Sequence, residues 1–404
     1  AGNLTIPRGV SLLGSFRAVP SHNLLLANNI SLLLSDGTVL VPTGGRGSIG
    51  CVVGTDDLDC DQAFINISAD ALVQGVVIYY QEQEQVALPV PYPWTFFLSG
   101  DNAALMDVEL LGSWNGISAV HASRHYIARV QGQPINVGVF VDQTYDIGRL
   151  EDIHFNPWFS WSVPFAYHQT TFGRAFVFAR SDWEYVFNTF AFGYAIGYHF
   201  IERASGSMNG NFLGIGMDLA TNASVQVDQS QSAGILITNG EFTAFCDKTH
   251  DKPNVSFQPV HVHVKPANTG PVKFVDTSFW GPAAGVALLE GTGTTTFIGC
   301  HFDDWDEHLT RSATSGDHYV HNGTAAIRHR GGALQLTGSE FKDPHKGAIV
   351  HVELGPSAAK AIVTDNIVAG PLTIRNDAPH AKVIVANNAD DPAMPGSVTV
   401  TDKP

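Results

Sequence analysis

The sequence predicts an all-β protein, a single-domain right-handed parallel β-helix with loops extruded between its coils. Three observations indicate this fold: few charged residues, abundant glycine and a repeat in the second half of the chain. Only 15% of the 404 residues are Asp, Glu, Lys or Arg, and 40 are glycine. A long helical protein needs many more charged residues on its exposed faces, whereas an all-β chain with many tight turns does not.

The repeat carries most of this prediction. Similar short segments, each following a β-branched or apolar stretch, occur at residues 237–242, 275–279, 298–302, 337–341, 364–368 and 386–390. Where no insertion intervenes they lie about 22 to 27 residues apart, the length of one β-helix coil. Stacked coils bury a column of apolar side chains that one coil cannot bury, so we expect Phe279, Phe302 and Phe341 to stack inside the helix. The long gap at residues 303–329 predicts an extruded loop.

Weaker segments of the same kind occur in the first half, and no linker or change of composition interrupts the chain. We therefore expect one domain over residues 1–404. A β-propeller would need repeats of about 40 to 45 residues, and a β-sandwich would not repeat as regularly.

The charge balance narrows the class of partner. The formal net charge is −16 and no run of basic residues occurs, which argues against binding to nucleic acid or to an anionic membrane. No stretch reaches the roughly 20 consecutive apolar residues of a membrane-spanning helix. An acidic surface repels polyanionic polysaccharides unless Ca²⁺ or a local basic patch intervenes, so the charge favours a neutral glycan.

Cysteines and glycosylation sequons indicate a secreted glycoprotein. Cys51 and Cys60 bracket a short acidic loop that a disulfide could close, and the absence of any CxxC pair argues against a zinc site. Asn-x-Ser/Thr sequons occur at Asn3, Asn29, Asn66, Asn222, Asn254 and Asn322. Such sequons are acceptors for N-glycosylation in the secretory route.

Two regions resemble a known superfamily. The opening Leu-Thr-Ile-Pro-Arg-Gly-Val-Ser-Leu-Leu-Gly at residues 4–14 resembles the first coils of the pectate-lyase-like superfamily of right-handed parallel β-helices, and residues 148–158 and 181–200 are similar to secreted members of that superfamily. The resemblance implies carbohydrate chemistry, carried out by hydrolases, lyases, esterases or epimerases, or sugar binding as in phage tailspikes. The motifs of polygalacturonases, pectin methylesterases and the best-known pectate lyases are missing, so the resemblance assigns no single reaction.

Residues 142–241 differ from the rest of the chain and are the predicted active groove. This region combines tryptophan and tyrosine with many carboxylates. Aromatic faces stack on sugar rings, and pairs of carboxylates perform the acid and base steps of glycoside hydrolysis.

The sharpest feature of the groove is the sequence Ser-Asp-Trp-Glu-Tyr at residues 181–185. On a continuous strand, Asp182 and Glu184 would lie on one face, close enough to shift each other's pKa and so to serve as acid and as nucleophile or base. The alternative is an exposed acidic strand face, or an Asp that caps a turn.

One of Asp146, Glu151 and Asp152 is the predicted partner carboxylate. They lie about one coil earlier, and neighbouring coils about 4.8 Å apart can supply the 5–10 Å spacing that a glycosidase needs. Glu151 and Asp152 would face opposite sides of a regular strand, so we expect at most one to take part. The alternative is that Asp146 forms a turn and that Arg149 pairs with a neighbouring acid.

Aromatic and basic residues of the same region are the predicted substrate contacts. The set consists of His154, Trp158, Trp161, Arg174, Arg180, Tyr194 and Glu241. We expect one of the two tryptophans to contact substrate, although large aromatic residues are as often core. Arg174 or Arg180 could serve a β-eliminating lyase, or could pair with the surrounding acids.

Three functions follow in order of preference. The first is a glycoside hydrolase that cleaves a polysaccharide or oligosaccharide and needs no cofactor. The second is a polysaccharide lyase acting on a uronic-acid glycan with Ca²⁺, and the third is a non-catalytic glycan-binding β-helix. His261 and His263 could chelate a metal together, but no third ligand is evident, so we expect no metal site.

Overall fold

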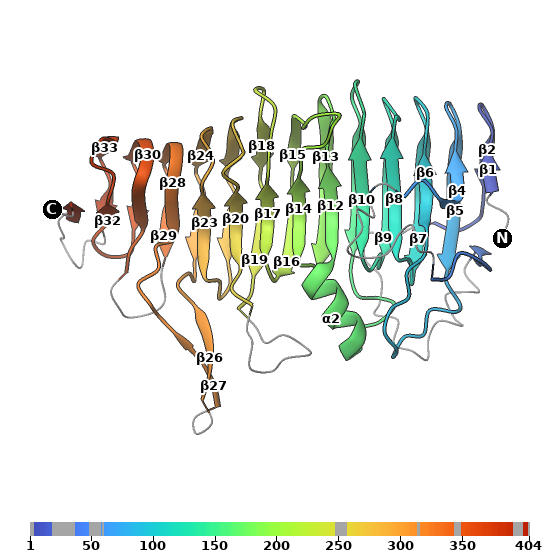
Figure 1. Ribbon diagram of the computed structural model, residues 1–404, viewed down its shortest axis with the longest axis horizontal. Coiled ribbons are helices and arrows are strands. Elements are labelled where there is room, and N and C mark those ends of the chain that lie inside the picture. Colours follow the sequence, from blue (N-terminus) through green and yellow to red (C-terminus); the bar gives the residue numbers. More distant parts are fainter. Residues whose placement is uncertain are drawn as a thin grey trace. The chain divides into compact units, whose positions relative to one another are not determined.

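The computed structural model describes residues 4–17, 37–47, 58, 60–246, 257–312, 316–342, 349–390 and 399–402. The described chain is a parallel β-helix (Figure 1), which confirms the predicted all-β fold class. Its contacts divide it into two compact units. Unit 1 is Ala1–Tyr198 with Glu202–Gly210, and unit 2 is His199–Ile201 with Asn211–Pro404. That residues 1–404 form one domain stays a prediction.

Unit 1 is built from two stacks of parallel strands. Its strands are β1 (Leu4–Ile6), β2 (Ser11–Leu13), β3 (Thr38–Leu40), β4 (Ala63–Ile67), β5 (Leu72–Tyr79), β6 (Trp94–Leu98), β7 (Ala104–Leu111), β8 (Asn115–Val120), β9 (Tyr126–Gly132), β10 (Val137–Asp142), β11 (Arg149–Phe155), β12 (Arg174–Phe178) and β13 (Glu184–Phe192). One stack runs β4–β6–β8–β10–β12 and the other β5–β7–β9–β11–β13. Each coil therefore contributes one strand to each stack. β14 (Ile196–Phe200) and β15 (Gly210–Leu213) contain residues of both units.

The outer face of the second stack of unit 1 is partly covered by its own chain. Helix α2 (Val163–Phe172), beside β12 in Figure 1, and the residues before it provide Phe159 and Phe165, which pack with Val77 and Leu111 of the strands. Gln133 holds this segment in place, because its side-chain oxygen accepts hydrogen bonds from the backbone N–H groups of residues 159 and 160 at 2.9 and 2.8 Å. None of the helices in the described ranges is long and apolar enough to cross a membrane.

Unit 2 has short strands of two to five residues, apart from the longer β28 and β30. Its strands are β16 (Gly216–Ala220), β17 (Ala223–Val227), β18 (Ile235–Thr238), β19 (Glu241–Ala244), β20 (Val260–Val264), β21 (Val272–Val275), β22 (Ser278–Trp280), β23 (Gly285–Leu289), β24 (Thr294–Ile298), β25 (His301–Asp303), β26 (His308–Ser312), β27 (Gly316–Val320), β28 (Ile327–Thr337), β29 (Glu340–Lys342), β30 (Val352–Thr364), β31 (Ile367–Val368), β32 (Thr373–Asn376), β33 (Lys382–Ala386), β34 (Ala389–Asp390) and β35 (Thr399–Asp402). Successive coils pair in parallel register, as in β19–β22–β25–β29.

The predicted repeat and its buried column are confirmed in unit 2. Phe279, Phe302 and Phe341 stack in register, with ring centroids 5.7 and 4.8 Å apart, and Phe242 extends the column at 5.5 Å from Phe279. The third residue of the repeat at 237–242 and the second residue of each of the other five turn the corner in the left-handed backbone region, which Gly, Asn and Asp adopt most readily. These corner residues are Asn239, Asp276, Gly299, Gly338, Asp365 and Asn387.

Small polar side chains follow the corner in several coils, because each forms a hydrogen bond to the coil before it. Ser339 Oγ accepts the backbone N–H of Cys300 at 3.1 Å, and Asn366 Oδ1 accepts that of Ser339 at 3.0 Å. Asn388 Oδ1 in turn accepts the backbone N–H of Asn366 at 3.1 Å. Each coil thus satisfies a buried donor of the coil before it, and a buried polar group without such a partner would be costly.

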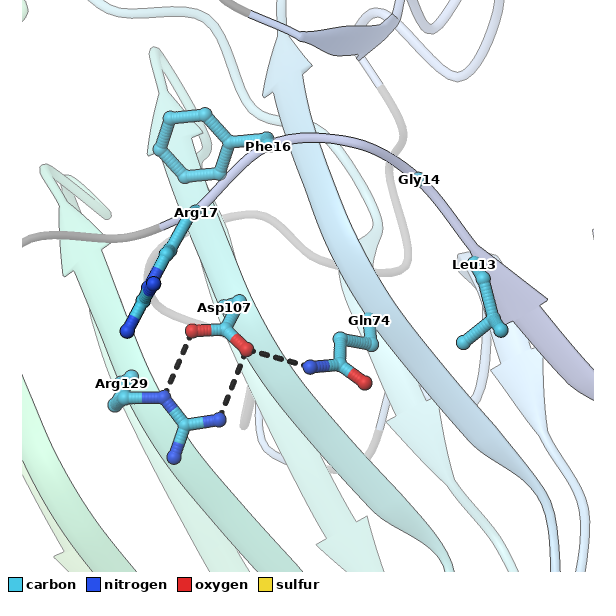
Figure 2. Close-up of a pocket in the computed structure, with 7 residues that line it drawn as sticks. All are labelled: Leu13, Gly14, Phe16, Arg17, Gln74, Asp107 and Arg129. Atoms are coloured by element: carbon cyan, nitrogen blue, oxygen red, sulfur yellow. Dashed lines mark hydrogen bonds and ion pairs between the residues drawn. The ribbon is translucent and has the colours of Figure 1, made fainter.

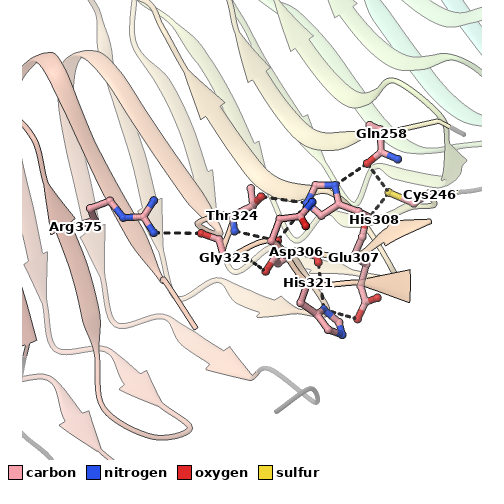
Figure 3. Close-up of polar contacts among 10 residues, drawn as sticks. Cys246, Gln258, Asp306, Glu307, His308, His321, Gly323, Thr324 and Arg375 are labelled. Carbon is pink, nitrogen blue, oxygen red and sulfur yellow. Dashed lines mark hydrogen bonds and ion pairs between the residues drawn. The ribbon is translucent and has the colours of Figure 1, made fainter. Parts of the chain in front are cut away.

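The predicted loop at residues 303–329 is also confirmed, because it contains the antiparallel hairpin β26–β27 that projects from the coils (Figure 1). The buried carboxylate of Asp306 organises its base. It accepts the backbone N–H groups of Asn322, Gly323 and Thr324 at 2.8–3.1 Å and lies 3.1 Å from His308 Nε2 (Figure 3).

Two of the four cysteines are buried free thiols. Burial raises the pKa of Cys246 and Cys300 to about 12, so both are protonated at neutral pH. The predicted Cys51–Cys60 disulfide lies outside the described residues, because Cys51 is not among them.

Candidate functional site

Five successive coils of unit 1 contain structurally equivalent six-residue segments of different sequence, at residues 70–75, 102–107, 124–129, 147–152 and 183–188. The sixth residue of every segment has a left-handed backbone, and so does the first residue of four of them. The sixth residues are Gly75, Asp107, Arg129, Asp152 and Asn188, and the left-handed first residues are Asp70, Asn102, Arg124 and Trp183. A left-handed residue turns the chain at the end of every segment and at the start of four of them, so each of these four presents a short flat stretch of strand between two corners.

The third and fifth residues of these segments point outward and lie in register from coil to coil, and all of them except the buried Ala128 are at least partly exposed. Together with the sixth residues they form the surface that we call the axial strip. Its outward rows are Leu72, Ala104, Tyr126, Arg149 and Tyr185, and Gln74, Met106, Ala128, Glu151 and Phe187. The fourth residues, such as Leu105 and Leu150, are fully buried and anchor the strip to the core.

One end of the axial strip opens into a pocket of about 660 Å³ that Gln74, Asp107 and Arg129 line together with Leu13, Gly14, Phe16 and Arg17 (Figure 2). Asp107 accepts two hydrogen bonds from the Arg129 guanidinium, at 2.7 and 2.8 Å, and one from the Gln74 amide at 2.7 Å. The hydrogen bonds from Arg129 hold the pKa of Asp107 below its usual range. This end therefore offers a fixed carboxylate and guanidinium beside two apolar side chains.

The other end of the axial strip is aromatic. Tyr185 and Phe187 are 43% and 48% exposed, and Trp183 at the preceding corner is 59% exposed. Side chains able to form hydrogen bonds flank them: Asn188 donates to Asp152 at 2.6 Å, and the Tyr126 hydroxyl donates to Glu151 at 2.8 Å. Exposed aromatic side chains grouped on one face are characteristic of binding surfaces.

The predicted pairing of Asp182 with Glu184 on one exposed face is wrong. Trp183 has φ +59°, so the chain turns a corner there and β13 begins only at Glu184. Glu184 is the second residue of its segment and is fully buried. Its carboxylate lies 3.0 Å from His125 Nε2 and accepts a hydrogen bond from Ser181 Oγ at 2.6 Å. It thus contributes to the core of unit 1, out of reach of a polymer on the surface.

The buried pair of His125 and Glu184 spans the coil between them. Gly148 occupies the equivalent position in that coil, and a Cβ atom there would collide with both side chains. His125 Nδ1 lies 2.9 Å from the Ala122 carbonyl oxygen, so both ring nitrogens have partners. Burial alone would lower the pKa of His125, but the charge of Glu184 and the hydrogen bonds to Glu184 and Ala122 outweigh burial and raise it.

Asp182 is half-buried and forms an ion pair with Arg180 at 2.9 Å. The Arg180 guanidinium also lies over the ring of the exposed Tyr145, 5.6 Å from its centroid. The sequence alternative of a salt bridge therefore describes Arg180. Asp182 is on the surface, but off the axial strip.

The three predicted partner carboxylates have different surroundings. Asp146 lies at a bend and forms an ion pair with Arg124 at 2.7 Å. Glu151 and Asp152 both lie on the axial strip, which corrects the expectation that they face opposite sides. The left-handed backbone of Asp152 breaks the strand alternation and leaves both carboxylates on the solvent side.

The predicted substrate contacts divide into buried and accessible residues. Trp158 and Tyr194 are fully buried, which contradicts a direct contact with substrate. Trp158 packs against His154 with ring centroids 4.8 Å apart, and the Tyr194 hydroxyl donates to the Pro134 carbonyl. Trp161, 37% exposed, packs edge-on against Phe192.

His154 and Arg174 are half-buried in unit 1. Glu241 belongs to unit 2, where its carboxylate accepts a hydrogen bond from Trp280 Nε1 at 3.3 Å. The predicted groove at residues 142–241 is therefore divided between the two units. Within it, only the part at residues 149–188 contributes residues to the axial strip.

Sequence reasoning missed Tyr185, Phe187 and the pocket residues as parts of one surface. A signal for them exists in the six-residue segments, which repeat a buried aliphatic fourth residue between two outward positions. Comparison of residues 102–107 with 183–188 places Tyr185 and Phe187 in the outward rows. The different residues at the corners, from Gly75 to Arg129, conceal this repeat.

Comparisons with known proteins add no functional name. No protein-family model and no curated protein sequence matches the chain. The solved structure of PfbA, a surface adhesin of Streptococcus pneumoniae, is similar with a TM-score of 0.36 and 7% sequence identity, over 81% of this chain and 80% of that chain.

Within the described ranges, no group of three or more His, Cys, Asp or Glu side chains could hold a metal ion.

Proposed function

We propose that the axial strip binds a glycan chain that runs along the β-helix axis. The observation that carries this proposal is the exposure of Tyr185 and Phe187 on adjacent outward positions, with Trp183 beside them. The apolar faces of sugar rings stack on such side chains. The five coils of the strip span four steps of about 4.8 Å, about 19 Å in all, so several sugar units can lie along it.

Polar groups of the strip would bind the hydroxyl groups of the same glycan. Arg129, Glu151 and Asn188 lie along it in successive coils, each with a hydrogen-bond partner that fixes its orientation. The net charge of −16 favours a neutral glycan over a polyanion at this surface. The resemblance to the pectate-lyase-like superfamily supports carbohydrate as the ligand class.

The double substitution Tyr185→Ala with Phe187→Ala tests this proposal. We expect it to weaken binding to a neutral polysaccharide about tenfold or more, because two exposed aromatic platforms are lost. Affinity electrophoresis against a panel of neutral polysaccharides, followed by calorimetry on the best ligand, measures the change. The matched control is Trp280→Ala, which removes an aromatic side chain with 42% exposure in unit 2 and should leave the affinity unchanged. Equal affinities of the double variant and wild type would refute the assignment.

A second candidate function is hydrolysis of the bound glycan. Glu151 favours it, because its carboxylate lies beside Phe187 in register, receives a hydrogen bond from Tyr126 and is next to Asp152. We propose Glu151 as the principal carboxyl group, with Asp152 as its partner. One carboxyl would protonate the leaving oxygen and the other would activate water or attack the anomeric carbon.

Reducing ends released from the same panel test hydrolysis. We expect Glu151→Gln to abolish the release of reducing ends while it retains binding of the glycan. The control is Asp101→Asn, which changes an exposed carboxylate off the strip and should keep full activity. New ultraviolet absorbance from an unsaturated uronide would instead support a lyase that uses Arg174 or Arg180 with Ca²⁺. If no bond is cleaved, the non-catalytic glycan-binding β-helix is the function that stands.

We also propose that the protein is secreted and N-glycosylated. Of the sequon asparagines in the described residues, Asn222 and Asn322 are exposed and Asn66 is half-buried. The sequons at Asn3, Asn29 and Asn254 lie outside the described residues. Attached glycans at Asn222 and Asn322 would fit an extracellular protein that meets polysaccharide there.

A further inference from the structure

A row of polar and charged side chains crosses the outward face of unit 2. His263 of β20, Arg328 of β28, Glu353 of β30 and Arg375 of β32 lie in register, with Leu288 of β23 between the first two. We call this surface the Arg328 face. Because neighbouring strands are about 4.8 Å apart, these side chains adjoin one another along the coil stack.

The carboxylates of the Arg328 face are already bound to other residues. Glu353 forms ion pairs with Arg330 at 2.6 Å and with Arg375 at 3.0 Å. Glu290 lies 3.0 Å from His263 Nε2. Both carboxylates therefore already have polar partners, and among the described residues neither forms an ion pair with Arg328.

Arg328 itself is the unusual member. Among the residues that the structure describes, no hydrogen bond or ion pair reaches its guanidinium, and its Nε is buried without a hydrogen-bond acceptor. Burial, together with the nearby Arg330, lowers the pKa of Arg328 even though Glu353 and Glu290 act in the opposite direction. A half-buried guanidinium without a bonded acceptor is costly, because arginine has five N–H donors that normally bind water or an anion.

The surroundings of Arg328 fix its position. Its guanidinium reaches back over Gly285 of β23, where an added Cβ would lie 3.5 Å from one of its terminal nitrogens. On the other side, Arg375 donates to the Gly323 carbonyl at 3.3 Å and so joins the face to the base of the β26–β27 hairpin (Figure 3). Asp306 holds that turn by three backbone N–H groups, so the rim beside Arg375 is rigid.

We propose that the Arg328 face is a binding site for an oxyanion, the carboxylate or sulfate group of an acidic sugar, with Arg328 as its principal donor. The planar guanidinium fork matches two oxygens of either group. Lys265, two residues after His263, adds positive charge beside the site. The site would be a local exception to the acidic balance of the chain, and it does not depend on the axial strip.

Calorimetric titration with three oligosaccharides of equal length, one uronic, one sulfated and one neutral, tests the site. We expect wild type to bind at least one acidic probe in preference to the neutral one, with affinity that falls as salt is raised. Arg328→Gln should weaken that binding at least tenfold, and Arg328→Lys should recover only part of it, because a lysine cannot offer the fork. Preference for the uronic or the sulfated probe identifies the source of the oxyanion.

Two further variants keep the result interpretable. Glu290→Gln retains a hydrogen-bonding side chain beside His263 and removes a negative charge, so it should tighten binding of the acidic probe by about threefold. The Tyr185→Ala, Phe187→Ala double variant should leave it unchanged, which separates this site from the proposed function. The proposal is overturned if neither acidic probe binds wild type, if the neutral probe binds equally well, or if folded Arg328→Gln binds as wild type does.

Discussion

Replacement of Glu184 with alanine is expected to lower the free energy of unfolding by about 3–5 kcal/mol, because it leaves His125 buried without its charged partner. Ser181 Oγ would lose its acceptor as well. Urea denaturation followed by tryptophan fluorescence measures the change. The matched control is Asp182→Asn, which removes a half-exposed carboxylate two residues away and should cost no more than about 1 kcal/mol. Similar losses for the two variants would show that the buried pair stabilises the protein no more than the partly exposed ion pair of Asp182 does.

The same pair predicts a pH dependence. Its partners raise the pKa of His125 above the unfolded value, so the stabilisation is fully present below about pH 6.5 and is lost as the pH rises through the folded-state pKa. We expect the stability advantage of wild type over His125→Gln to be larger at about pH 6 than at about pH 9. An advantage that grows with pH would mean that His125 is not protonated in the folded protein.

Truncation of Phe302 to alanine is expected to cost about 3–5 kcal/mol in unit 2. Phe302 is fully buried and contacts Phe279 on one side and Phe341 on the other, so its removal opens a cavity in the middle of the column. Phe302→Leu should cost clearly less, since it fills most of that space. Thermal and urea unfolding give the two values.

The control for Phe302 is Trp280→Ala, which removes a larger but exposed side chain from the neighbouring coil. It should change the stability by less than about 1 kcal/mol. If Phe302→Ala were as mild as this control, the column would be able to collapse around the missing ring.

The aromatic column was predictable because one short repeat carries both its corner and its buried residue. In the segment containing Phe302, the left-handed Gly299 turns the chain and the apolar residue three positions later enters the core. Gly, Asn and Asp adopt that backbone at low cost, so the corner is visible in the composition itself. The local pattern and the packing agree there.

The position of Glu184 was not predictable, because its corner residue is a tryptophan. Trp183 adopts a left-handed backbone that bulky residues rarely occupy, so Ser-Asp-Trp-Glu-Tyr has the pattern of a continuous strand. A shift of one residue reverses which side chains face the core. Trp158 was misassigned for a different reason: it lies in the segment that covers the strands of unit 1, and no local pattern shows that burial.

The His125–Glu184 bridge also limits how this protein can change its length. A solenoid can gain or lose whole coils by duplication or deletion, because each coil contacts only its neighbours. His125 and Glu184 are 59 positions apart and meet across the single intervening coil of Gly148. An inserted coil would pull them out of reach, and a deleted one would remove the gap that Gly148 leaves for them. In unit 1 the number of coils between these two residues is therefore set at one.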